Sequence, residues 1–507
     1  MIIGDSLAGP IDRGRQLVNI AINAGRAYQS AQTGFVHICY RPLDEEHADT
    51  IPLYENFLFA LALLRERTSE SVKEGKSLLS KLLNFQSFFE ETSQGNFPVY
   101  LHEYPSCKDT HLAGKLLPVF YWIVRNFYLV LGAELREQLA SAASIMLGYL
   151  RELDECQLSF MPTLRLAIAK KAFGELWEQP VLVEEAEETL TRLSQSWNQC
   201  PYPISFCPKK MGEVLLLLQL AYQRVEDSPW QSLWEHASQF WHTQTGSYCG
   251  PAWDEWQHKR EPEVTILDWV LGFHAPNLSY RAFNNGPHLL ECALIHPTED
   301  KLEKTPAVLA LQGSDCERAW CVQKTESFTW SALEKDQMRP SKDSSLAPFR
   351  LLWGDINNTQ TFVLQGGHIE RVYFEKKDRY IDLFLQLPSD IPPEAGRKNR
   401  EVQLFLSYNE DTQLCVQGVK AATTFQLGEE LSFSSAGLCV SFSIELEEGR
   451  GQFFGHIARA NRPSQRACTG DSRFVSYDWH FFLRTMQRSS NCLLRLRIQL
   501  NEEEKSL

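Results

Sequence analysis

The chain has 507 residues, too many for one ordinary hydrophobic core, so two or three domains are expected. Hydrophobic residues make up 43% and charged residues 22%, a composition that excludes a disordered chain. The net charge of −14 argues against a nucleic-acid-binding protein, which normally presents a basic face.

Residues 1–16 do not form a basic start followed by an apolar core, so we expect no signal peptide and a cytoplasmic protein. The longest apolar run, residues 116–132, is interrupted by Pro118, Arg125 and Asn126, which predicts a buried helix and no membrane insertion. The 13 cysteines form no CxxC pair. Reduced thiols, no structural disulfide and no metal site are therefore expected. Phosphate-loop, dinucleotide, HExxH and GxSxG motifs are absent from the sequence, so no cofactor is expected.

Up to about residue 245 the sequence predicts helices in pairs. Residues 51–67 and 211–225 are apolar nearly all the way round, as in helices buried on two sides. More amphipathic segments follow them at 69–91 and 229–244. Residues 115–132 and 133–153 form another such pair, as do 164–177 and 180–197. These segments predict four helical hairpins.

A short loop with an aromatic residue and a proline follows each amphipathic helix. These loops are "GNFPVY", "LSFMP", "YPISFCP" and "GSYCGP". They indicate a loose repeat of hairpins about 40 to 60 residues long. Hairpins that alternate a buried with an amphipathic helix favour a double-layered α/α toroid, with an open α-solenoid as the alternative.

From about residue 263 the hydrophobic period changes to two. Residues 438–446 alternate apolar and polar side chains, and 379–388, 401–410 and 491–500 do the same. Many strands without intervening helices indicate a large antiparallel sandwich. We expect a long loop or a boundary at 334–348 and a hairpin turn at His368. At Arg495 and Arg497 we expect cross-strand salt bridges, with a cationic strip as the alternative.

The predicted fold class is therefore α+β and multidomain. An N-terminal α/α toroid of helical hairpins spans residues 1–262, and a large antiparallel β-sandwich region spans 263–507. This order of elements resembles that of polysaccharide lyases of the heparinase II/III and alginate lyase type. The resemblance covers nearly the whole chain and includes no diagnostic motif.

The resemblance implies β-elimination on a uronate-containing glycan in the cleft between toroid and sandwich. In those lyases Tyr and His act as acid and base, while Asn, Gln or Arg neutralises the uronate carboxylate of an enolate-like intermediate. Residues of these types occur in three stretches, 96–105, 242–260 and 279–288. The catalytic candidates are Tyr280, His102, Arg281, Asn284 and His288. The substrate-binding candidates are Tyr100, Tyr104, Tyr248, Trp253, Trp256, His258 and Asn285.

Structural roles explain the same residues. Loop tyrosines and histidines commonly serve packing, and Asn284 and Asn285 belong to an "NNGP" turn signal. Trp253 and Trp256 are three residues apart, so they also suit one buried face of a short helix.

Two other functions fit the same architecture. One is a non-catalytic scaffold that binds a glycan or a protein. The other is an α/α-toroid glycoside hydrolase, which needs two carboxylates facing one cleft. The expected partner is an oligo- or polysaccharide, and the sequence points to no particular protein partner.

Overall fold

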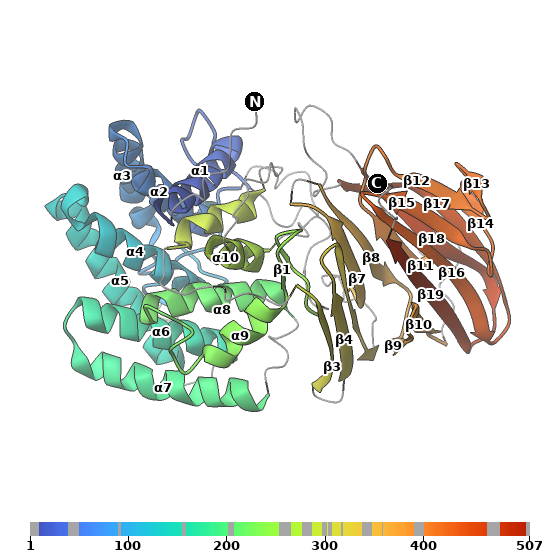
Figure 1. The fold of residues 1–507 in the computed structure, drawn as a ribbon. Coiled ribbons are helices and arrows are strands. Elements are labelled where there is room, and N and C mark those ends of the chain that lie inside the picture. The colour runs from blue at the N-terminus through green and yellow to red at the C-terminus, as the bar shows by residue number, and fades with distance from the viewer. Residues whose placement is uncertain are drawn as a thin grey trace, which may run out of the picture.

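The computed structural model describes residues 10–38, 50–89, 93–154, 159–200, 207–252, 265–275, 286–296, 302, 307–315, 318–336, 347–356, 358–389, 400–463 and 477–502. Within these ranges helices fill the first part of the chain and antiparallel strands the second (Figure 1). The predicted α+β multidomain fold class is confirmed.

Helices α2 to α9 follow the four predicted hairpins, and α1 and α10 are additional to them. Their bounds are α1 Pro10–Tyr28, α2 Leu53–Glu66, α3 Ser69–Leu82, α4 Leu112–Leu131, α5 Ala133–Asp154, α6 Phe160–Leu176, α7 Pro180–Gln199, α8 Pro208–Ala221, α9 Gln231–Gln239 and α10 Ile266–His274. Short 3-10 helices are η2 Leu83–Phe85, η4 Leu101–Glu103 and η6 Pro287–Leu294. Within the described residues no helix has the length and apolar character needed to span a bilayer.

The inner helices form a closed ring. Helix α2 contacts α4, α4 contacts α6, α6 contacts α8, and α8 contacts α10. The η6 helix contacts both α10 and α2, and α1 packs against α2 and η6. The outer helices α3, α5 and α7 pack on α2, α4 and α6. Because the first and last elements meet, the helical half is a toroid and not an open solenoid.

Two arginines form hydrogen bonds between the first and last elements of the ring. Arg13 of α1 donates to the carbonyl oxygen of Phe273 at 2.8 Å, at the end of α10. Arg65 of α2 donates to the carbonyl of Ile295 at 2.9 Å, just beyond η6. Each cation satisfies carbonyls that a helix end leaves without a partner, and its charge complements the negative end of the helix dipole.

The strands form two large sheets and one small one. The eight-stranded sheet has the order β13 (Val419–Lys420), β12 (Gln413–Val416), β15 (Leu431–Ser435), β16 (Leu438–Glu448), β19 (Cys492–Glu502), β10 (Tyr380–Leu387), β9 (Arg371–Lys376), β6 (Lys335–Asp336). The nine-stranded sheet has the order β14 (Thr424–Phe425), β17 (Gly451–Pro463), β18 (Tyr477–Arg488), β11 (Arg400–Leu406), β8 (Thr359–Gly367), β7 (Phe349–Gly354), β5 (Phe328–Leu333), β4 (Arg318–Lys324), β3 (Leu309–Asp315). Strands β1 (Trp241–His242) and β2 (Ser247–Tyr248) form a separate hairpin.

The two large sheets enclose one hydrophobic core. Strand β16 buries Leu438, Val440, Phe442 and Ile444 in it, as the two-residue period predicts. The indole nitrogen of Trp353 in one sheet donates to the carbonyl of Ser435 in the other at 2.8 Å. On the opposite face of the eight-stranded sheet, arginines of β19 form the predicted cross-strand salt bridges. Arg497 pairs with Asp382 of β10 at 2.8 Å, and Arg495 pairs with two glutamates of β16.

The β1–β2 hairpin joins the two halves of the molecule. Lys324 of β4 donates to the carbonyls of Gln239 and Trp241 at 2.8 and 3.1 Å. Val322 and Leu352 of the nine-stranded sheet belong to the hydrophobic core of the helical half. One face of that sheet therefore packs on the helices, and its other face lines the sandwich core.

The helical half extends beyond the expected boundary at residue 262. Helices α10 and η6 both follow that position, and the first strand of the large sheets, β3, begins at Leu309. The segment "ILDWVLGFH" of α10 is almost wholly buried. A short, uniformly apolar segment has no readable period, so the sequence did not separate a helix from a strand there.

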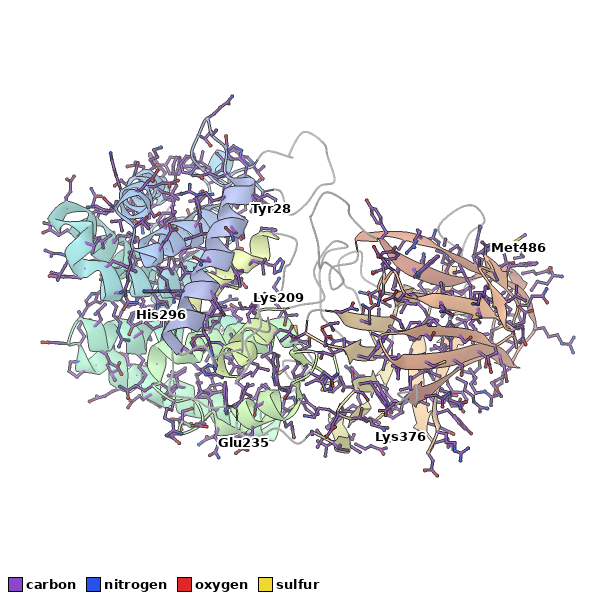
Figure 2. The ribbon with its side chains drawn as sticks, turned by 45° about the horizontal axis from the view of Figure 1, so that its top comes forward. Tyr28, Lys209, Glu235, His296, Lys376 and Met486 are labelled. Carbon is purple, nitrogen blue, oxygen red and sulfur yellow. The ribbon has the colours of Figure 1, made fainter. Side chains whose placement is uncertain are left out.

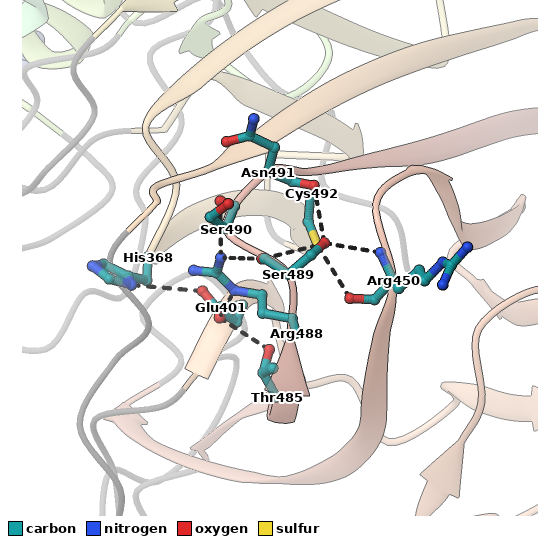
Figure 3. A network of polar contacts seen from close by, with 9 residues as sticks. All are labelled: His368, Glu401, Arg450, Thr485, Arg488, Ser489, Ser490, Asn491 and Cys492. Carbon is teal, nitrogen blue, oxygen red and sulfur yellow. Dashed lines mark hydrogen bonds and ion pairs between the residues drawn. The ribbon is translucent and has the colours of Figure 1, made fainter.

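His368 lies between the two sheets and not in a hairpin. Strand β8 belongs to the nine-stranded sheet and β9 to the eight-stranded one, so the turn at His368 carries the chain across the sandwich. Figure 3 shows the polar network beside this turn. Its centre is the buried carboxylate of Glu401, which accepts from Arg488 Nε at 2.7 Å and from Thr485 Oγ1 at 3.0 Å. His368 Nδ1 lies 3.6 Å from the second oxygen of Glu401. Of the expected loop or boundary at 334–348, residues 337–346 lie outside the described residues.

The close contact between α8 and α10 makes Gly212 a sensitive position. A Cβ atom at Gly212 would lie 2.5 Å from the backbone nitrogen of Leu267, so one helix must move. We expect Gly212→Ala to destabilise the protein by about 1–3 kcal/mol. Gly148 in α5 has nothing within 4 Å of such a Cβ. The matched change Gly148→Ala should leave stability unchanged or raise it by up to about 1 kcal/mol. Thermal unfolding measures the stability of both variants. If the two substitutions change stability equally, the α8–α10 contact at Gly212 is not as close as described.

Candidate functional site

The predicted residues of the first toroid loop lie against the start of α2. Tyr100 forms a β-bridge with Pro52, and the amide of Leu101 donates to the carbonyl of Ile51 at 2.9 Å. The Tyr100 and His102 rings stack with centroids 5.6 Å apart. His102 is exposed, whereas Tyr104 packs edge-on against Phe85 and Phe89.

Tyr248 differs from its expected place in a substrate-binding wall. It lies in β2 with a relative exposure of 1%, and its ring packs edge-on against Phe240. Its backbone amide donates to the Asp268 carboxylate of α10 at 2.7 Å. Tyr248 therefore stabilises the junction between hairpin and toroid. From the sequence alone, an aromatic residue just before Gly250 and Pro251 suits packing and sugar stacking equally.

The other candidates of the second and third loops lie outside the described residues. They are Trp253, Trp256, His258, Tyr280, Arg281, Asn284 and Asn285. His288 is described and lies at the start of η6, directly after one of these segments.

His288 belongs to a group of ionisable residues that the sequence analysis did not single out. We call this group the inner cluster. It comprises Tyr54, Glu55, Lys115, Arg165, Lys209, Glu213, His288 and Glu291.

The inner cluster is built from the first turns of the inner helices. Tyr54 and Glu55 begin α2, Lys115 begins α4, and Lys209 begins α8, while His288 and Glu291 lie on η6. Since these helices share one ring, their N-terminal turns meet at one end of the toroid. The positive ends of the helix dipoles add to the cations there.

This end of the toroid is next to the β half. Gly212, one turn into α8, lies against Leu267 at the start of α10. Asp268 of α10 binds the amide of Tyr248, and two residues later the carbonyl of Gly250 accepts from Ser331 of β5 at 3.3 Å. Figure 2 labels Lys209 on the side of the helical half that faces the sheets.

Glu291 is a carboxyl of the cluster whose pKa is raised toward neutrality. Burial raises the pKa of its carboxyl to about 7, Lys209 and Lys115 oppose this rise, and Glu213 and Glu55 add to it. A carboxyl with a pKa near neutrality can both accept and donate a proton at physiological pH, which is the property of a general acid or base.

The neighbours of Glu291 are held in defined protonation states. Burial, followed by the charge of Lys209, lowers the pKa of His288 to about 3, so this imidazole is neutral. Burial, followed by the charge of Glu291, raises the pKa of the Tyr54 hydroxyl well above its ordinary value. A neutral imidazole and a neutral phenol can donate hydrogen bonds without adding charge.

Cations complete the cluster. Arg165 Nε of α6 pairs with Glu213 Oε1 of α8 at 2.7 Å, which ties two inner helices together. Lys115 and Lys209 are exposed, and both act on the Glu291 carboxyl. The arrangement combines a proton-transferring carboxyl with cations that can hold an anionic group.

A sequence signal for these residues exists in hindsight. Glu213 and Arg165 interrupt the otherwise apolar segments "MGEVLLLLQL" and "LRLAIA" near their starts. A charge buried on the inside of a toroid is costly unless it is paired or used. Because these two segments are far apart in the sequence, the sequence does not show that Arg165 and Glu213 are in contact.

No protein-family model and no curated protein matches this chain. Three solved structures similar to it are polysaccharide lyases. A xanthan lyase from Paenibacillus aligns with 99% of this chain and 58% of its own length, at 8% identity and a TM-score of 0.48. A chondroitin AC lyase from Streptomyces coelicolor A3 aligns with 100% of this chain and 81% of its own, at 8% identity and 0.44. A heparan sulfate lyase from Pedobacter heparinus aligns with 100% and 86%, at 8% identity and 0.33.

These are the class of proteins that the order of elements resembles. The chain spans less than two thirds of the xanthan lyase. At such identities and scores the comparisons assign no activity, substrate or residue role to this chain, so the argument that follows uses its own residues.

Proposed function

We propose that the chain cleaves a uronate-containing polysaccharide by β-elimination at the inner cluster. The observation that supports this most is the carboxyl of Glu291, with a pKa raised to about 7, beside the charge of Lys209. β-Elimination needs a base for a carbon-bound proton and a cation for the neighbouring carboxylate. The cluster offers both.

The reaction assigns each residue one task. Ionised Glu291 takes the proton from the carbon next to the uronate carboxyl group. The electrons of that bond form a carbon–carbon double bond, and the bond to the glycosidic oxygen breaks. Lys209 holds the uronate carboxylate and stabilises the negative charge that develops there. Neutral His288 donates a hydrogen bond to the same group.

The departing glycosidic oxygen needs a proton. Tyr280 or His102 provides it in this proposal, with Arg281 and Asn284 as further ligands of the carboxylate. His102 is on the loop that is bridged to Pro52, directly before α2. Tyr280 precedes His288 by eight residues in the sequence.

The assay follows formation of an unsaturated uronate, which absorbs in the ultraviolet. Wild-type protein should form it from at least one polymer among alginate, hyaluronan, chondroitin sulfate, heparan sulfate and xanthan. Of His102→Ala and Tyr280→Phe, the variant that removes the proton donor should lower the rate about 100-fold to 10,000-fold, and neither should change the melting temperature. His37→Ala is a control, because this half-buried histidine is not part of the inner cluster and hydrogen-bonds Thr33. Absence of the product with every polymer would refute the proposal.

One observation favours a glycoside hydrolase as the second candidate. Glu291 shares the inner cluster with Glu55 and Glu213, and a carboxyl with a raised pKa beside a second carboxylate suits an acid and base pair. The two reactions differ in their products and in pH dependence. A hydrolase forms new reducing ends without ultraviolet absorbance, and its rate falls as Glu291 loses its proton above about pH 7. In the elimination the rate rises over the same range.

A further inference from the structure

The Glu213 carboxylate of the inner cluster pairs with a cation of another helix. It accepts from Arg165 Nε of α6 at 2.7 Å, and Arg165 Nη2 bonds the same oxygen. Lys209 precedes Glu213 by four residues on α8, a spacing that places both side chains on one helix face. Within the described residues, however, the hydrogen bonds and ion pairs of Glu213 all go to Arg165. The carboxylate is thus paired between helices and not along its own helix.

The packing of Arg165 fixes where it holds Glu213. The stem of Arg165 lies along Gly114 of α4, where an added Cβ atom would be 3.4 Å from Arg165 Cδ and 3.6 Å from its Cβ. Only 11% of the Arg165 side chain is exposed. A planar guanidinium enclosed between α4 and α8 has little freedom to move, so the ion pair keeps Glu213 in one position.

The charge of Glu213 acts on the proposed base. Burial is the largest cause of the raised pKa of Glu291, and the charge of Lys209 opposes it. The charge of Glu213 comes next and adds to the rise, followed by Lys115, which lowers the pKa, and Glu55, which raises it. The position of Glu213 therefore affects the protonation of Glu291.

Tyr54 of α2 shows that the ion pair and Glu291 belong to one site. After burial, the charge of Glu291 and then that of Glu213 raise the pKa of the Tyr54 hydroxyl. The charge of Arg165 lowers the pKa of the same hydroxyl. Groups from α6, α8 and η6 thus act at one place, and Arg165 counteracts the charge of the carboxylate that it holds.

Charges on the other elements packed against η6 bind backbone groups elsewhere. Arg13 of α1 donates to the carbonyl of Phe273 at 2.8 Å. Asp268 of α10 accepts from the amide of Tyr248 at 2.7 Å. Substitutions in the Arg165–Glu213 pair leave these bonds in place.

We propose that Arg165 is a positioning residue that holds Glu213 away from Lys209 and sets the pH range in which Glu291 acts as a base. The inference rests on the proposed function for the roles of Lys209 and Glu291. Without Arg165, the charge of Glu213 is no longer compensated beside Glu291, and the carboxylate can pair with Lys209 on its own helix. Glu291 then keeps its proton to a higher pH, and Lys209 binds the uronate carboxylate less well. Arg165 acts through Glu213 and not on the substrate.

The pH profile of kcat/KM tests this role. Arg165→Gln should move its midpoint up by about one pH unit and raise KM about tenfold. Glu213→Gln should move the midpoint down. The double variant should return KM to near the wild-type value and the midpoint to that of the wild type or below it, because no carboxylate remains to be held. A role limited to tying α6 to α8 predicts no shift of the midpoint and no recovery in the double variant.

A measurement without substrate separates the inference from the proposed function. The difference in melting temperature between a protein and its Glu291→Gln variant changes with pH until the folded state has lost the Glu291 proton. In the Arg165→Gln background, the pH at which this difference levels off should be about one unit higher. In the Glu213→Gln background it should be lower, which tests the same coupling if Arg165→Gln does not fold.

Lys170→Gln is a matched control on the same helix. Lys170 follows Arg165 by five residues and pairs with Glu185 of α7 at 3.2 Å, so it also ties two helices together. It is not part of the inner cluster. We expect the wild-type KM and the wild-type midpoint from this variant.

The outcomes separate the two proposals. Opposite shifts with Arg165→Gln and Glu213→Gln, and none with Lys170→Gln, support the positioning role. If no polymer is cleaved but the substrate-free shifts are found, only the elimination is wrong. An unchanged midpoint in folded Arg165→Gln and Glu213→Gln overturns the positioning role and leaves the elimination intact. A double variant as impaired as Arg165→Gln also overturns it.

Discussion

Glu291→Gln is expected to lower the rate of elimination about 100-fold to 10,000-fold, with KM nearly unchanged. The amide keeps the shape of the side chain and its hydrogen-bonding capacity, but it cannot accept the carbon-bound proton. In the wild type the rate should rise as pH increases through about 7, because the carboxyl becomes ionised there. Steady-state kinetics over a range of pH measure both effects.

The same variant should lose activity but gain stability relative to the wild type as pH rises. The pKa of Glu291 is raised from 4.5 to about 7, so the folded state holds its proton more tightly than the unfolded state. The stability that this provides is complete below about pH 4.5 and is lost as pH rises to about 7. The melting temperature of Glu291→Gln minus that of the wild type should therefore be larger at pH 8 than at pH 4.5.

A charge-matched control is Glu188→Gln, on the exposed face of α7. It should change neither the rate nor the pH dependence of the melting temperature. If Glu291→Gln retains wild-type activity, Glu291 is not the base. If its melting temperature follows that of the wild type at every pH, the shifted pKa is not present in the folded protein.

Arg488→Met is expected to destabilise the protein by about 3–5 kcal/mol, because it leaves the Glu401 carboxylate buried without its cation. The side chains of both residues have no solvent exposure. Arg488 also donates to the carbonyl of Ser489 at 3.2 Å, so the pair holds the β18–β19 turn against the crossing at His368 (Figure 3).

The double variant Glu401→Leu with Arg488→Met tests the reason for that loss. Removing both charges also removes the cost of burying them, so most of the stability should return. Arg450→Gln is the control, since the network uses the backbone of Arg450 and its side chain is exposed. Its effect should be within about 0.5 kcal/mol. Urea unfolding followed by tryptophan fluorescence measures all three, and an Arg488→Met protein as stable as the wild type would show that the pair is not a major support.

The hydrophobic period correctly predicted a helical part followed by a strand part, because it is a local property. The all-round apolar segments at 51–67 and 211–225 are the inner helices α2 and α8, and the alternation at 438–446 is strand β16. The period fails where a segment is short and wholly buried, as in α10. Tyr248 shows a second limit of sequence-based prediction. A tyrosine can serve core packing or sugar binding, and the residue type alone does not say which.

By itself the sequence determined helices α2 to α9, their pairing into hairpins, and alternating strands such as β16. Each of these depends on neighbours within a few residues along the chain. Only the tertiary structure decided that Tyr54, Lys209 and Glu291 share one end of a closed ring, and that Phe405 lies beside His480 on β18. Such pairings join residues from 75 to more than 200 positions apart, and they depend on how whole elements pack. The shifted pKa of Glu291 has the same origin, because it depends on burial and on charges from three other elements of the fold, α2, α4 and α8.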